Sequence, residues 1–149
     1  MDREHIAYQI FYSYLLERMT SKLNDRISKA LSFLLLILGS TVISSHFNPV
    51  LVGLTITIIS AINTVCSFSA SAELARVQSS RYLKLYNCLH TIKSDEDLMH
   101  QLIKIQEDDK IPNPTLARLA ERESGMTFED FKVSGLPSKK EKLYSFFVN

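Results

Sequence analysis

The chain contains 149 residues, of which 46% are hydrophobic and 22% are charged, and its formal net charge is +1. Basic residues are interleaved with acidic ones, which argues against a nucleic-acid-binding protein. Cys66 and Cys88 fall in regions that we expect to differ in environment, so the sequence predicts no disulfide framework. These averages conceal an apolar middle, because no Lys, Arg, Asp or Glu occurs between Ala30 and Ala72.

Residues 1–26 are predicted to form an amphipathic cytosolic or interfacial helix, because they contain no Pro or Gly and Ile6, Ile10 and Tyr14 recur at helical spacing. Two arrangements remain open: a helix that lies on the membrane, or one helix that continues into the next segment. Aromatic residues near its start suit either the membrane interface or packing against the helix that follows the apolar middle. We favour packing.

Residues 27–72 are predicted to form a transmembrane helical hairpin with spans at about 27–45 and 49–71. A bilayer core about 30 Å thick needs roughly 20 mostly apolar residues in a helix. The second run reaches this length, and the first does so if Lys29 extends toward the headgroups. The alternative is a soluble protein with two core helices, which we disfavour because the rest of the chain is strongly polar.

Basic residues flank both runs, and the loop between the runs contains no Lys or Arg. By the positive-inside rule, both termini are cytoplasmic in a multi-pass membrane protein. Asn48-Pro49 suits a turn outside the membrane, because a residue that precedes Pro is disfavoured in the helical region.

The second span carries small and polar residues that share one face of the predicted helix. We interpret this stripe as the seam between helices, or as a pore lining contributed by several chains, and we favour the seam. One hairpin encloses no lumen, so a pore requires several copies. The spans lack ionisable groups, which argues against a proton-coupled transporter. The stripe consists of Gly53, Thr57, Ser60, Asn63, Thr64 and Ser67.

Residues 73–110 are predicted to form a cytosolic helical stalk. The helix of the second span is expected to continue to about Lys93, and Ser94 with Asp97 resembles a capping box that begins another helix. An apolar stripe in this region, from Tyr82 to Ile92, is expected to pack against the N-terminal helix.

Residues 111–149 are predicted to form a short helical C-terminal region. Asn113 suits an N-cap, Pro114 suits the first helical position, and Gly125 suits the end of that helix. The tail combines basic and aromatic residues, which suit contact with a partner or with anionic lipid, or packing on the stalk. The candidate contact residues are Lys139, Lys140, Lys142, Phe146 and Phe147.

Catalytic motifs are absent from the sequence. No His pair has the spacing of metal ligands, and no Gly-rich loop suits a phosphate group. We therefore expect no enzyme activity, no cofactor and no metal site.

The layout resembles the SLATT family of bacterial two-transmembrane effectors over roughly residues 1–110. The similarity rests on the N-terminal helical segment DREHIAYQIFYSYLLERMTSKLNDRISK, the two spans and the following segment ELARVQSSRYLKLYNCLHTIK. The resemblance implies a membrane-perforating effector of the bacterial cell inner membrane, in a conflict system that uses nucleotide second messengers. The region after Pro112 is too short for a typical nucleotide-binding domain. A signal would therefore bind between protomers, or a separate sensor protein would detect it.

The sequence thus predicts an all-α membrane protein: a transmembrane hairpin with cytosolic amphipathic helical extensions, assembled into an oligomer. The expected partners are the lipid bilayer, further copies of the chain and a sensor protein or nucleotide signal. The expected function is a regulated pore-forming or membrane-disrupting effector in anti-phage defence. A non-conducting anchor that recruits a cytosolic partner and a phage holin are the alternatives. The large cytosolic share of the chain counts against the holin.

Overall fold

The computed structural model describes residues 2–43, 48–131 and 135–148, and within these ranges it contains helices and no strand. The all-α prediction is therefore confirmed. The helices are α1 (Arg3–Ile43), α2 (Pro49–Cys66), α3 (Phe68–Asn87), α4 (Asp95–Gln106), α5 (Pro114–Thr127), the 3-10 turn η1 (Glu129–Phe131) and α6 (Lys139–Val148).

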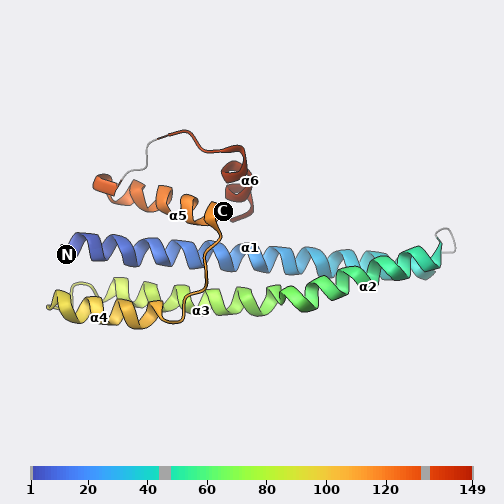
Figure 1. The fold of residues 1–149 in the computed structure, drawn as a ribbon, viewed down its shortest axis with the longest axis horizontal. Helices are drawn as coiled ribbons and strands as arrows, with labels where there is room; N and C mark the ends of the chain where they lie inside the picture. The colour runs from blue at the N-terminus through green and yellow to red at the C-terminus, as the bar shows by residue number, and fades with distance from the viewer. Residues whose placement is uncertain (1, 44–47, 132–134, 149) are drawn as a thin grey trace.

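The longest element, α1, runs without interruption through the predicted boundary at residue 26. Of the two arrangements considered, the continuous helix is therefore correct. Its 41 residues correspond to a length of about 60 Å at about 1.5 Å per residue. Figure 1 shows α2 and α3 in line with each other and antiparallel to α1, and the hydroxyl of Ser21 in α1 donates to the carbonyl of Ala72 in α3 at 2.8 Å.

The start of α2 is capped by Asn48, whose side chain accepts from the Val50 amide at 3.0 Å, with Pro49 in the first turn. The predicted uninterrupted second helix is wrong at Ser67, which separates α2 from α3 in a left-handed conformation with φ 45°. The Ser67 amide still donates to the Asn63 carbonyl at 3.1 Å, and its carbonyl accepts from Ser71 at 2.9 Å. The two helices are therefore connected by helix-like hydrogen bonds across a single irregular residue.

The predicted continuation to Lys93 is also wrong, because α3 ends at Asn87. The Arg3 guanidinium donates to the carbonyls of Leu89 and Ile92 in the following turns and pairs with Asp95 at 2.7 Å. These contacts satisfy carbonyl groups that no longer accept helical hydrogen bonds. The predicted N-cap of α4 is confirmed, because the Ser94 hydroxyl accepts from the Asp97 amide at 3.3 Å.

One hydrophobic core joins the N-terminal half of α1 to α3 and α4. This confirms the prediction that the N-terminal helix packs against the segment after the second span. The most buried members, each at most 1% exposed, are Ile6, Ile10, Tyr82, Leu98 and Leu102.

A second core forms where α1 packs against α5 and α6, so α1 lies between two layers of helices (Figure 1). The N-cap of α5 is confirmed, because the Asn113 side chain accepts from the Thr115 amide at 2.9 Å. Gly125 does not end this helix as predicted: it is buried within α5, and the Phe128 amide still bonds to the Ser124 carbonyl at 3.0 Å. At the start of α6, the Ser138 amide donates to the buried carboxylate of Glu141 at 3.3 Å.

Candidate functional site

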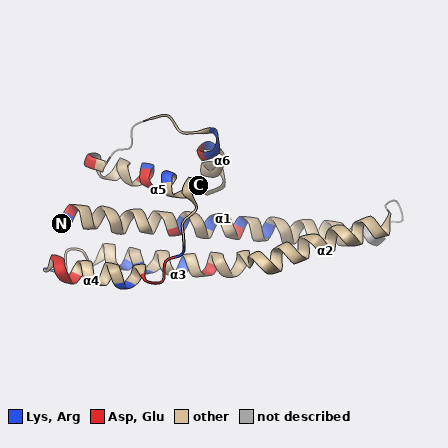
Figure 2. Ribbon diagram, viewed as in Figure 1, with Lys and Arg blue, Asp and Glu red and all other residues tan. Residues whose placement is uncertain are grey.

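The C-terminal half of α1 and the whole of α2 form an end of the molecule that carries no charged side chain after Lys29 in the described residues (Figure 2). Large apolar side chains are exposed along it, including Val50 and Leu51 in the first turn of α2. Val65, near the other end of α2, is 83% exposed. Contiguous exposed apolar surface of this kind is typical of a site that contacts a membrane or another protein.

Within the described residues, one helical stretch is long and apolar enough to cross a membrane, Pro49–Asn87. Only 6% of its most apolar window is buried. This low burial disagrees with the alternative that the second run is a core helix of its own chain. The first predicted span corresponds to the end of α1, and its last residues, 44 and 45, lie outside the described residues.

The members of the predicted polar stripe on the second span differ in exposure. Ser60 and Asn63 are half-buried beside the seam with α1, where Val52 is buried, whereas the other members are exposed. A Cβ atom added at Gly53 would meet no atom within 4 Å, so this glycine does not provide close approach within the chain. The exposed members are Gly53, Thr57, Thr64 and Ser67.

The exposed hydroxyl groups of the stripe are hydrogen-bonded to their own helix. Thr57 donates to the Gly53 carbonyl and Thr64 to the Ser60 carbonyl, each at 2.9 Å, and Ser67 donates to the Thr64 carbonyl at 3.0 Å. In hydrocarbon an unpaired hydroxyl is costly, and these bonds remove that cost. Each hydroxyl oxygen keeps capacity to accept from water or from a second helix.

A groove of about 500 Å³ lies between α1, α3 and the connection from α4 to α5. It extends from Cys66, next to the break between α2 and α3, to the connecting residues 108–113. Its polar lining includes side chains from all three elements, among them Glu17, Asn24, Gln78, Arg81, Asp108 and Lys110.

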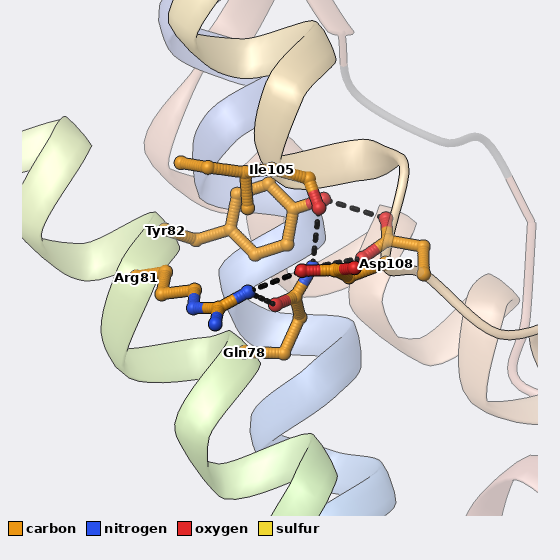
Figure 3. A network of polar contacts seen from close by, with 6 residues as sticks. Gln78, Arg81, Tyr82, Ile105 and Asp108 are labelled. Carbon is orange, nitrogen blue, oxygen red and sulfur yellow. Dashed lines mark hydrogen bonds and ion pairs between the residues drawn. The ribbon is translucent and has the colours of Figure 1, made fainter.

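A polar network fixes the connection to α3 at one end of this groove (Figure 3). The Gln78 amide donates to the Ile105 carbonyl at 2.5 Å and to Asp109 at 2.7 Å, and the Tyr82 hydroxyl donates to Asp109 at 2.5 Å. Arg81 pairs with Asp108 at 2.5 Å. Sequence analysis missed this network, because its members lie far apart in the chain and form no motif.

Glu17 adds a titratable group to the groove. Burial, with the nearby charge of Asp109 as the second cause, raises the pKa of Glu17 to about 7, and Lys110 acts in the opposite direction. Burial also raises the pKa of Tyr82, and its hydrogen bond to Asp109 adds to this effect. The Tyr82 hydroxyl therefore remains a hydrogen-bond donor at neutral pH.

The C-terminal candidate residues lie on α6. Lys139, Lys140, Lys142, Phe146 and Phe147 are all exposed. The opposite side of α6 packs in the second core through Tyr144 and Val148, against α1 and α5 rather than against the predicted stalk, so the helix has one packed face and one exposed face. The Arg26 guanidinium donates to the Phe146 carbonyl at 3.1 Å, and Arg122 pairs with the buried Glu141 at 3.4 Å.

No group of three or more His, Cys, Asp or Glu side chains within the described residues has an arrangement that would hold a metal ion. The two Cys residues are free and exposed. No protein-family model, curated protein or solved structure matches the chain.

Proposed function

We propose that this chain is a multi-pass protein of a bacterial inner membrane, with two spans, cytoplasmic termini and a helical cytosolic base. The observation that carries the proposal is the exposed, charge-free end formed by α2 and the part of α1 after Lys29. In water this surface would strongly favour association, whereas in a bilayer it is solvated by lipid. Helices also satisfy their own backbone polar groups, as a membrane requires.

Within the membrane, the chain acts as a regulated oligomeric effector that opens a pore or disrupts the bilayer. The support is the pair of exposed hydroxyls at Thr57 and Thr64, which lie seven positions apart on one face of α2 and point away from the seam with α1. Such a face suits contact with water or with a neighbouring copy. The resemblance to the SLATT family is the basis for assigning the effector to anti-phage defence, with a nucleotide signal or sensor protein as its trigger.

A non-conducting anchor is the second candidate, and one observation favours it. The same hydroxyls already donate to backbone carbonyls of α2, so the helix needs no water-filled lumen to satisfy them. The two candidates differ in one testable respect. An effector permeabilises the membrane and requires the face of α2 that carries Thr57 and Thr64, whereas an anchor does not permeabilise it.

The test is to express the full chain in bacteria, with any co-encoded partner, and to measure membrane potential and dye entry. Two variants with the same chemistry distinguish the faces of α2. Thr64→Val removes a hydroxyl from the stripe, and Thr55→Val removes an exposed hydroxyl with an equivalent bond, to the Leu51 carbonyl at 2.9 Å. These positions lie nine residues apart, which places them on opposite sides of a helix.

The effector proposal expects depolarisation by the wild type and by Thr55→Val, with reduced depolarisation by Thr64→Val. Asn63→Leu, which removes a half-buried amide beside the seam, should also reduce it. If neither the wild type nor the variants depolarise cells while the protein accumulates in the membrane, the effector proposal fails and the anchor is the better account.

A further inference from the structure

We propose that the exposed face of α6 binds the anionic headgroup region of the cytoplasmic leaflet, with Phe146 and Phe147 inserted at the membrane interface. This face, the α6 foot, consists of Lys139, Lys140, Lys142, Phe146 and Phe147. The inference deepens the proposed function and rests on the insertion of the charge-free end.

The first argument is the position of the α6 foot along α1. Val148 packs in one core with Leu15, Leu16 and Met19, and the Phe146 carbonyl accepts from Arg26. The end of α6 is therefore fixed on α1 between Leu15 and Arg26, and of these contacts Arg26 lies four residues before the charge-free stretch. From Arg26 to Ala30, α1 rises about 6 Å, which is comparable to the roughly 5–8 Å thickness of each interfacial layer.

The second argument is the chemistry of the aromatic pair. Phe146 is 77% exposed and Phe147 is 42% exposed, and their rings contact each other edge to face with centroids 5.7 Å apart. The neighbouring Tyr144 and Val148 are the residues with which α6 packs on the base. Phe146 is thus largely free of the packing of α6 and Phe147 is partly so, and aromatic side chains are favoured at the boundary between lipid and water.

The third argument is charge. Lys139, Lys140 and Lys142 are exposed, and the acidic residue among them, Glu141, is buried and paired with Arg122. Arg26 and Lys29 are exposed on α1 just before the charge-free stretch, although Lys29 also pairs with Asp25 at 2.6 Å. Basic residues near an anionic leaflet each strengthen membrane attachment by about fivefold, so the three lysines together amount to about 100-fold.

The occupant to which these arguments point is lipid rather than a partner protein. The aromatic pair is held by Arg26, four residues before the surface that is itself proposed to be in the bilayer, and the surrounding charges complement anionic headgroups. A docked protein would not require the pair to lie at this level of α1.

The chain contains no Trp, which allows a direct test with single tryptophan reporters in the full-length protein. Phe146→Trp reports on the α6 foot. Met126→Trp is the control in the base, and Leu36→Trp is the control in the charge-free end. The three native side chains have matched exposure, at 77%, 71% and 70% respectively.

Each variant is reconstituted in nanodiscs that contain phosphatidylglycerol, and tryptophan quenching is measured with lipids brominated near the headgroup or near the end of the acyl chain. We expect Phe146→Trp to be quenched by the shallow bromines, Leu36→Trp by the deep bromines, and Met126→Trp by neither. Replacing the three lysines of the α6 foot with Gln, or replacing phosphatidylglycerol with a neutral lipid, should lower the quenching of Phe146→Trp but not that of Leu36→Trp.

The outcomes separate this inference from the proposed function. If Leu36→Trp is quenched and Phe146→Trp is not, the charge-free end inserts and the α6 foot does not contact lipid, which overturns the inference. If Leu36→Trp is not quenched by either lipid, the proposed insertion fails and the inference fails with it. If Phe146→Trp is quenched equally in neutral lipid and without the lysines, the electrostatic part of the inference is wrong.

Discussion

Glu17→Gln tests the electrostatics of the groove. The carboxylate lies between α1 and the α4–α5 connection, and burial together with Asp109 raises its pKa from 4.5 to about 7. Gln has nearly the same shape and no charge, so the substitution removes the titration while it retains most of the packing. We expect the variant to be more stable than the wild type above neutral pH.

The direction in which stability changes with pH follows from proton linkage. Because the folded chain holds this proton more tightly than the unfolded chain, the stabilisation is complete below the unfolded pKa of 4.5 and is lost as the pH rises through about 7. The full shift would correspond to about 3 kcal/mol. Solvent reaches the half-buried carboxylate, so we expect about 1–2 kcal/mol after screening.

The assay is thermal unfolding of the full chain in detergent, followed by the helical circular dichroism signal. Between about pH 5 and pH 8 the Tm of the wild type should fall relative to that of Glu17→Gln, by several degrees. Glu107→Gln, which removes an exposed carboxylate next to the same connection, is the matched control and should run parallel to the wild type. If Glu17→Gln also runs parallel to the wild type across this range, Glu17 is not buried beside Asp109 and the reasoning is refuted.

Three further substitutions test other parts of the fold in the same unfolding assay. Tyr82→Phe removes the hydrogen bond to Asp109 and should lower the free energy of unfolding by about 1–2 kcal/mol, whereas an unchanged Tm would mean that the network does not hold the connection. Leu102→Ala empties a fully buried position between α1, α3 and α4 and should cost about 2–5 kcal/mol; a loss below 1 kcal/mol would contradict that core. Ser67→Gly relieves the left-handed conformation and should raise stability by up to about 1 kcal/mol, and a destabilised variant would argue against that conformation.

The features that were predicted correctly depend on contacts between residues near one another in sequence. Ser94 and Asn113 begin helices because a side-chain oxygen accepts from an amide two or three residues later, and that geometry is encoded locally. The packing of Ile6 and Ile10 was predicted from helical periodicity, because a polar segment with a narrow apolar stripe has only one face to bury.

The features that were missed depend on tertiary structure. Gln78 is a polar residue in the middle of α3 and Asp109 follows the end of α4, and nothing in the sequence indicates that the α4–α5 connection returns to α3. Gly125 has the residue type of a helix end, but packing of α5 against α1 keeps it inside the helix, and tertiary context of this kind routinely overrides intrinsic propensity. Ser67 breaks a helix without Gly or Pro, the two residue types that mark breaks in a sequence.

The divided polar stripe of α2 shows a limit that is specific to apolar segments. In the helices of the two hydrophobic cores, the hydrophobic pattern identifies the buried face because the other face is polar. In α2 apolar residues surround the polar stripe on every side, so the same pattern does not determine which side contacts α1. The periodicity correctly placed Asn63 near Thr57 and Thr64 on the helix surface, but only the tertiary structure places Asn63 beside the seam and the two threonines outside it. Because the seam and the outer face therefore carry different members of one stripe, substitutions at Asn63 and Thr64 probe packing within a chain and contacts beyond it, respectively.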